Sequence, residues 1–173
     1  MPNKIQNREN IVPIQNPPLL IRDLRRKRTA DSAAKLYQIF ERDPEKYSKE
    51  VIPALREQRT GESALQIGQI ALSHHEYSDD AIAALREMQM DEAAIQIKEI
   101  AFKVDGTALK AIDALEEMET DNAPELILII GKKNPKFQKK AQKALERLEQ
   151  TAPRFPSVSV EPLTDAEKIQ KAI

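Results

Sequence analysis

Apolar residues return along this chain with a period of about thirty residues. Five leucines, spaced 31, 30, 30 and 30 positions apart, mark the period: Leu24, Leu55, Leu85, Leu115 and Leu145. An isoleucine stands three residues before each of the first four, and an alanine directly precedes each of the last four. A fixed period of this length indicates an array of repeats, each made of one supersecondary unit.

A second set of apolar positions recurs at the same period in the other half of each unit. Its members are each followed three residues later by an isoleucine, and they are Leu36, Ile67, Ile97 and Ile127. Spacings of three and four place side chains on one stripe of a helix, whereas a strand alternates between faces. Each unit is therefore predicted to be two amphipathic helices, and stacked units bury both stripes in one core.

Capping residues and prolines predict where the helices begin. Side-chain oxygens that can accept from free backbone N–H groups precede the isoleucine helices, at Thr29 or Asp31, Thr60, Asp91, and Thr120 or Asp121. Asp43-Pro44 and Asn134-Pro135 each indicate a cap followed by a proline in the first turn. Pro53 interrupts a leucine helix, so we expect it to kink that helix or to delay its start to about Val51.

These boundaries predict an all-α repeat domain over residues 18–150. It begins with a half unit at about 18–28, continues through four isoleucine helices, and ends with the leucine helix at about 136–150, nine helices in all. Residues 1–17 are expected to form a disordered lead. Residues 151–173 are expected to form a proline-containing tail with a short helix from Thr164 onward.

Composition is consistent with a thin aliphatic core. Aromatic residues make up only 4% of the chain, tryptophan is absent, and charged residues reach 32%. The absence of cysteine excludes disulfides, thiolate metal sites and a cysteine nucleophile. The best apolar run, 126–130, is far shorter than the ~18 residues of a membrane span, and the polar N-terminus does not resemble a secretory signal. We therefore expect a cytoplasmic protein.

The formal net charge of −1 conceals three charged blocks. Residues 19–28 carry five basic and one acidic residue (+4), residues 76–125 carry four basic and fourteen acidic (−10), and residues 132–147 carry seven basic and one acidic (+6). These blocks are the solvated faces of exposed helices, or the acidic middle attracts a basic protein partner. A further alternative is that the last block contacts phosphates through Lys132, Lys133, Lys136, Lys139, Lys140 and Lys143.

The last isoleucine helix is apolar where its siblings are polar. Leu126, Leu128 and Ile129 occupy columns that hold lysine, glutamine, glutamate, tyrosine or glycine in the earlier units. A contiguous exposed apolar patch requires a cover. That cover is expected to be the tail, whose apolar residues are Phe155, Val158, Val160, Leu163 and Ile169, or else a partner or a second copy of the chain.

No constellation typical of catalysis is present. His74 and His75 are the only histidines, and the nearby Glu76, Asp79 and Asp80 lack the ligand spacing of zinc sites. No serine nucleophile motif, phosphate-binding loop or dinucleotide-binding glycine pattern occurs. We expect a protein that is not an enzyme and that binds no metal and no cofactor.

The thirty-residue two-helix unit, including segments 79–88 and 134–148, resembles the short HEAT-like repeats of phycobilisome-lyase-type proteins. The resemblance covers residues 19–150 and implies a right-handed α-solenoid of about four and a half repeats. It also implies that the second helix of each pair lines the concave side. The partner-binding residues would then be Lys35, Gln38, Arg42, Gln66, Gln69, Ser73, Gln96, Glu99, Lys103, Leu126, Leu128, Ile129 and Lys133.

The sequence therefore predicts a non-enzymatic protein-binding scaffold or adaptor that holds a protein or peptide partner, which the acidic middle suggests is basic. Two alternatives stay open: a nucleic-acid-binding protein that uses the basic run at 132–147, and a lyase-like helper enzyme similar to the phycobilisome HEAT proteins. The identity of the partner and the oligomeric state are not determined by the sequence.

Overall fold

The described part of the chain, residues 16–151 of the computed structural model, is all helical. It contains nine α-helices and two short 3-10 helices and no strand. The predicted all-α class and the number of helices are confirmed for these residues. The predicted lead and tail lie outside the described residues, apart from the helix ends at Pro17 and Thr151.

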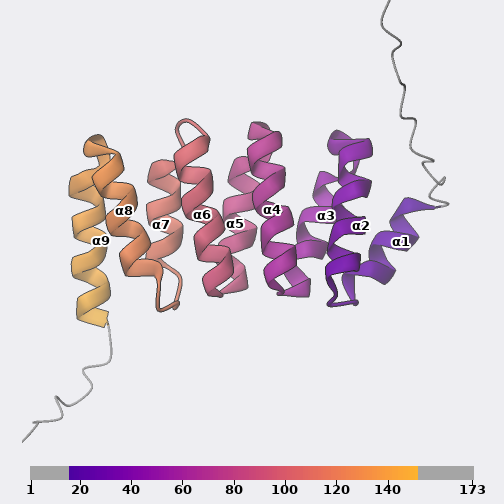
Figure 1. Ribbon diagram of the computed structural model, residues 1–173, viewed down its shortest axis with the longest axis horizontal. Coiled ribbons are helices and arrows are strands. Elements are labelled where there is room, and N and C mark those ends of the chain that lie inside the picture. Colours follow the sequence, from indigo (N-terminus) through magenta and orange to yellow (C-terminus); the bar gives the residue numbers. More distant parts are fainter. Residues whose placement is uncertain (1–15, 152–173) are drawn as a thin grey trace, which may run out of the picture.

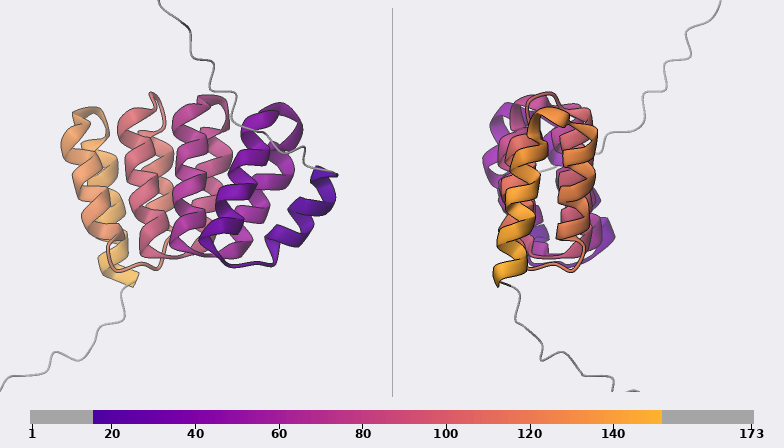
Figure 2. Two further views of the ribbon diagram at one scale, coloured as in Figure 1. Left: turned by 45° about the vertical axis from the view of Figure 1, so that its right-hand side comes forward. Right: turned by 90° about the vertical axis from the view of Figure 1, so that its left-hand side faces the viewer.

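The helices form two layers that run the length of the molecule. The odd layer contains α1 (Pro17–Arg25), α3 (Pro44–Gln58), α5 (Ser78–Met88), α7 (Ala108–Glu116) and α9 (Gln138–Thr151). The even layer contains α2 (Ala30–Arg42), α4 (Gly61–Ser73), α6 (Asp91–Lys103) and α8 (Ala123–Lys133). Each helix packs on its sequence neighbours and on the helix two places away, within its own layer. Figure 1 shows the resulting row, and the right-hand view of Figure 2 shows the two columns end-on.

Both predicted apolar columns lie in the core between the layers. Leu55, Leu85 and Leu115 of the odd layer are fully buried, as are Leu36, Ile67, Ile97 and Ile127 of the even layer. The column weakens at α9, where Leu145 is half-buried and Gln142 is exposed, because no further repeat within residues 16–151 covers this helix. Burial of these stripes against one another is the main stabilising term.

Three of the predicted helix starts are confirmed. Thr29 and Thr60 cap α2 and α4 through reciprocal hydrogen bonds with Ser32 and Ser63, three residues later. The Asp43 side chain accepts from the backbone N–H of Lys46, 3.2 Å away, and Pro44 stands in the first turn of α3. These oxygens satisfy N–H groups that the helix cannot pair internally.

The other predicted caps are wrong. α6 begins after Met90 and α8 after Asn122, and neither residue makes a side-chain cap. Instead, Asn122 Nδ2 donates to the backbone oxygen of Asp91, 3.1 Å away, so this side chain joins the starts of α6 and α8. Asn134 also makes no side-chain cap, and its side chain donates back to the Ile130 carbonyl at the end of α8. Asn122 thus makes a contact between repeats, and Asn134 pairs a carbonyl at the end of the preceding helix.

Pro53 neither delays the start of its helix nor divides it. α3 runs without a break from Pro44 to Gln58, seven residues longer than a helix that started at Val51. Proline removes the bond to the carbonyl four residues earlier, that of Lys49. Since Lys49 is exposed, water can reach its backbone at the outer face of the helix, which reduces the cost of the missing bond.

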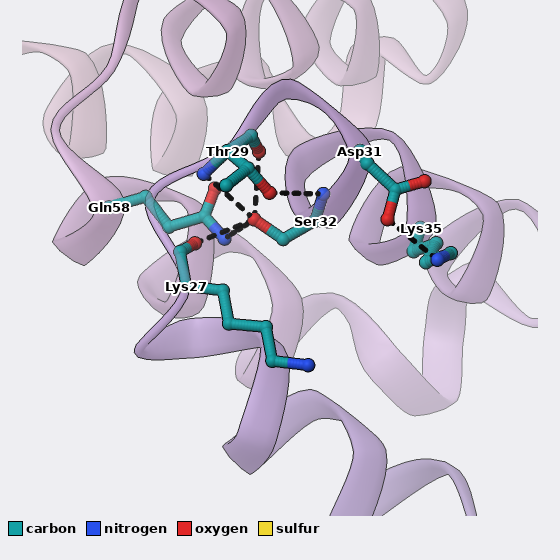
Figure 3. A network of polar contacts seen from close by, with 6 residues as sticks. All are labelled: Lys27, Thr29, Asp31, Ser32, Lys35 and Gln58. Atoms are coloured by element: carbon teal, nitrogen blue, oxygen red, sulfur yellow. Dashed lines mark hydrogen bonds and ion pairs between the residues drawn. The ribbon is translucent and has the colours of Figure 1, made fainter.

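A buried polar network joins the first three helices, as Figure 3 shows. Gln58, fully buried at the end of α3, donates from Nε2 to the Leu24 carbonyl and to Ser32 Oγ, both 2.9 Å away. Ser32 Oγ is also within 2.6 Å of the Lys27 carbonyl and 2.8 Å of the Thr29 carbonyl. Carbonyls in the turn between α1 and α2 are therefore paired by side chains, which ties the half repeat to the first full one.

Candidate functional site

The surface charges of the odd layer pair consecutive repeats with one another. Arg56 Nη1 lies 2.6 Å from Glu87, and Arg86 Nη1 lies 2.9 Å from Glu117, each pair spanning 31 residues. An Arg25–Glu57 pair occupies the same place at the first junction. In each pair, the basic residue directly follows the repeating leucine of one unit, and the acidic residue stands two positions after the repeating leucine of the next unit.

The last junction of the odd layer has the reverse polarity. There Glu116 follows Leu115 where the earlier units have arginine, and Arg147 stands where they have glutamate. Arg147 Nη1 lies 2.8 Å from Glu116 Oε1, so the pair is preserved with its charges exchanged. Two substitutions far apart in the sequence therefore compensate at one junction.

This pairing changes the meaning of the acidic block at 76–125. Six of its fourteen carboxylates form ion pairs with lysine or arginine: Asp79, Glu87, Glu99, Asp113, Glu116 and Glu117. Three of these pairs use cations from outside the block, Arg56, Lys140 and Arg147, so the field that would attract a basic partner is weaker than the net charge of the block alone indicates. The odd layer uses its charges mainly to hold repeats together.

The outer face of the even layer carries an apolar strip instead. The strip consists of Leu65 and Leu72 on α4 and Ile95 and Phe102 on α6. Leu65 is 44% exposed and Ile95 41% exposed, while Leu72 and Phe102 are partly buried. On each helix the two residues are seven positions apart, so they lie on one side, roughly 10 Å apart along the axis.

Charge borders the strip along both of its edges. The even helices run in the same direction, so all their N-termini lie along one edge and their C-termini along the other (Figure 1). Acidic residues occupy the first turns, at Asp31, Glu62, Asp91, Glu92 and Glu125. Basic residues occupy the last turns of α2, α6 and α8, at Arg42, Lys103, Lys132 and Lys133, whereas the last turn of α4 has none. This arrangement complements the helix dipoles and gives the face an acidic edge, an apolar middle and a basic edge.

Charged side chains lie among the strip residues: a lysine lies over one ring, and a carboxylate lies between two of the residues. Lys133 Nζ of α8 lies 3.9 Å from the centre of the Phe102 ring. Glu99, between Ile95 and Phe102 on α6, lies 2.9 Å from Lys98 and 3.3 Å from Lys103. The hydrogen bond from Lys98 lowers the pKa of the Glu99 carboxyl, and Lys103 lowers it further, although partial burial opposes both. Glu99 is therefore ionised at neutral pH.

The structure places the predicted ladder on this layer but divides it into two sets. Gln38, Gln69, Glu99 and Ile129 lie on the outer face, among the strip residues or in line with them. Gln96 instead packs sideways onto α4, where its side chain lies against Gly68. Gln66 is half-buried at the equivalent position of α4, while Lys35, on the first helix of the layer, is exposed. Gln66 and Gln96 of this second set therefore pack between neighbouring helices of the layer and contribute little to its outer surface.

The predicted exposed patch on α8 is wrong for one of its three residues. Leu126 is buried, with 7% exposed, because it belongs to the same sideways column as Gln66 and Gln96 and faces α6. Leu128 is 42% exposed and Ile129 is half-buried. The tail that was expected to cover these residues lies outside the described part of the chain.

The periodic pattern predicted the core columns and did not predict the four strip residues, which lie outside those columns. Leu65 and Ile95 each stand two positions before a core isoleucine, which places them about 200° around the helix, on the far side. The same column holds Ala34 in the first unit and Glu125 in the last. The one feature of the sequence that indicated the strip was therefore the presence of large apolar residues in this column in the two central repeats alone.

The lysines of the basic run are spread around the corner formed by α8, the 3-10 helix Pro135–Phe137 and α9. Lys140 Nζ lies 2.5 Å from Asp113, and Lys133 lies over the Phe102 ring. The other four are exposed: Lys132, Lys136, Lys139 and Lys143. Lys136 also lies over an aromatic ring, with its Nζ 5.6 Å from the centre of Phe137, so three of the six predicted phosphate contacts are engaged within the protein.

His74 belongs to an aromatic cluster at the end of α4. Its ring meets the Phe40 ring edge-on at 5.2 Å, and its Nε2 lies 3.2 Å from Glu41. Burial raises the pKa of the Tyr37 phenol beside it, and a hydrogen bond with Glu41 raises it further. Within residues 16–151 no three histidine, aspartate or glutamate side chains gather as a metal site. The contacts of this cluster join α2 to α4.

No helix in the described residues 16–151 combines the length and the apolar character needed to cross a bilayer. Comparison of the chain with protein-family models, with curated proteins and with solved structures finds no match. The strip on the even layer is therefore identified by its geometry alone.

Proposed function

We propose that this protein is a non-enzymatic scaffold or adaptor that binds a protein partner on the outer face of the even layer. In this proposal the two-layered stack is a right-handed α-solenoid of HEAT-like repeats, and the protein works in the cytoplasm. The alternating packing of helices within each layer supports the architecture. A fluorescent fusion imaged in the native cell tests the location.

The observation that carries the proposal is the pair of exposed apolar side chains on adjacent helices, Leu65 and Ile95. A single exposed leucine is ordinary, whereas neighbouring apolar residues bordered by charge are typical of recognition surfaces. α4 and α6 pack with axes roughly 8–10 Å apart, so the strip fits one helix or extended segment that crosses both. That segment would have an apolar stripe, with basic residues toward Glu62 and Glu92 and acidic residues toward Lys103.

The test is capture of partners from a lysate of the native organism, identified by mass spectrometry. A variant with Leu65→Asp and Ile95→Asp is expected to lose the partner, because two carboxylates would have to be desolvated at the centre of the contact. Gln69→Arg or Glu99→Arg on the same face should also abolish capture. Thermal unfolding followed by circular dichroism checks that every variant remains folded.

Leu109→Asp is the matched control. Leu109 is 40% exposed on α7 of the odd layer, so the substitution has the same chemistry and similar exposure on the opposite face. It is expected to leave capture unchanged. Capture retained by the double variant, or lost equally in the control, would count against the even-layer face.

A further inference from the structure

A strongly charged hollow opens beside α1 and α3. It has a volume of about 590 Å³, and every residue that lines it is charged: Arg22, Arg25, Arg26, Arg28 and Glu57. Four guanidinium groups and one carboxylate give the lining a charge of 4 − 1 = +3. Such a concentration of like charge is unfavourable unless an anion offsets it.

Among the described residues 16–151, an acidic partner is found for one of the four arginines, Arg25. Arg25 donates from Nε and Nη2 to both oxygens of Glu57, a bidentate pair. The hydrogen bond from Arg25 lowers the pKa of the Glu57 carboxyl, so this residue is an ionised acceptor already in use. The side chains of Arg22, Arg26 and Arg28 have no ion pair within residues 16–151.

The next junction of the odd layer shows that this excess charge is not required by helix packing. A hollow of about 350 Å³ lies between α3 and α5, where Pro53 and Arg56 take the places of Arg22 and Arg25. Its charged lining residues are Lys49, Arg56, Asp80 and Glu87, which sum to zero. The same type of junction is therefore neutral in one repeat and carries +3 in the other.

The repeat register shows that two of the three additional arginines depart from the repeat pattern, because Arg28 has a counterpart in Arg59. Arg26 stands in the column that holds Glu57, Glu87 and Glu117 in the following units. Arg22 stands in the column that holds Pro53 and Ala83. The first unit thus has two arginines where the second, third and fourth units have an acid or a small apolar residue, and both arginines line one hollow. The last unit has Lys143 and Arg147 in these columns.

We propose that this hollow binds a phosphoryl group. A phosphomonoester carries roughly −1.5 to −2 charges at pH 7 and three acceptor oxygens, so one or two such groups match a lining of +3. A ligand that offset the same lining charge with carboxylates would need three of them. Guanidinium groups also suit phosphoryl oxygens because they donate in parallel pairs. The site is separate from the strip on the even layer and does not depend on the function proposed for it.

Calorimetric titration of the full-length protein tests the site with two probes, inorganic pyrophosphate and a phosphoserine peptide beside its unphosphorylated form. Saturable binding that weakens as salt is raised is expected for at least one of them. Stronger binding of pyrophosphate assigns the group to a small molecule, and stronger binding of the phosphopeptide assigns it to a modified protein. Failure of both probes at low ionic strength would overturn the proposal.

The decisive variant combines Arg22→Ala with Arg26→Glu. It restores residue types found in the same columns of other repeats, so the fold should tolerate it, and it brings the lining charge to zero. Binding is expected to weaken by at least roughly tenfold, since hydrogen bonds to charged groups are lost. Unchanged affinity in this variant would overturn the site.

The matched control is Lys143→Ala with Lys139→Glu on α9, which makes the same change in net charge at the opposite end of the molecule. Both lysines are exposed. Affinity should stay at the wild-type value, because the control leaves the hollow intact. An equal loss in the control would show that net charge alone controls binding, and the assignment to this hollow would be wrong.

Discussion

Substitution of Gly131 by alanine gives a sharp test of how closely the last two helices pack. Gly131 is buried in α8, and a Cβ added there would lie 2.6 Å from the Cβ of Ala141 on α9. Carbon atoms in contact are separated by roughly 3.5–4.0 Å, so the helices would have to move apart by about 1 Å. Neither atom lies on a flexible side chain, so the backbone must absorb the change.

The expected magnitude is a difference between two opposing effects. Alanine in a helix gains about 1 kcal/mol over glycine, whereas overpacking a core costs about 1–3 kcal/mol. Gly131→Ala should therefore destabilise the protein by about 1 kcal/mol, which corresponds to roughly 3 °C in Tm for a domain of this size. The middle repeats hold Ala71 and Ala101 in this column, so a wider spacing is compatible with the fold.

Chemical denaturation followed by circular dichroism measures the effect, and a reciprocal exchange separates packing from propensity. The double variant Gly131→Ala, Ala141→Gly moves one methyl group from α9 to α8 and should recover wild-type stability. Gly68→Ala is the contrasting control, because the atoms nearest to its added Cβ belong to the flexible Gln96 side chain, with Oε1 the closest, and this side chain can rotate away. It should be neutral or slightly stabilising. Wild-type or greater stability of Gly131→Ala alone would refute the reasoning.

Three further predictions concern the polar contacts between repeats. Gln58→Ala should cost about 1–3 kcal/mol and speed hydrogen exchange in α1, because buried acceptors lose their donor. Glu116→Arg and Arg147→Glu should each lower Tm and together restore part of it, which a double-mutant cycle measures. Because the Arg25 hydrogen bond lowers the pKa of Glu57, the Arg25–Glu57 pair stabilises the fold above the unfolded-state pKa of Glu57, and this stabilisation is lost as the pH falls through the folded-state pKa. Arg25→Gln should therefore lower the free energy of unfolding at pH 7, and its difference from wild type should shrink as chemical denaturation is repeated at lower pH.

Much of the fold was predictable from the sequence because the repeat supplies independent copies of one pattern. The columns of Leu55 and Ile67 were assigned to the core from spacing alone, and both are fully buried. Thr29, Thr60 and Pro44 marked helix starts because their effect is local, within one turn of the chain. Such features need no knowledge of neighbouring repeats.

The candidate site was only partly predictable, because it depends on which flank of each helix a neighbour covers. Leu126 was expected on the surface since its column is polar in earlier units, yet α6 covers it. Leu65 and Ile95 were overlooked, although they remain exposed on the opposite side from the core. A helical pattern gives the direction of a side chain around its own axis, and the stacking of helices determines whether that direction meets solvent.

Charge shows the same division between local and long-range information. The three charged blocks were visible along the chain, but Arg147 compensates Glu116 only because α9 lies beside α7. The sums over the blocks also could not reveal that the hollow beside α1 has a lining charge of +3 while the next hollow of the odd layer is neutral. Periodicity determined the helices, their number and their buried stripes, since these follow from spacing within one or two turns. Tertiary packing determined the exposed strip and the ion pairs, since these require distances between residues about thirty positions apart.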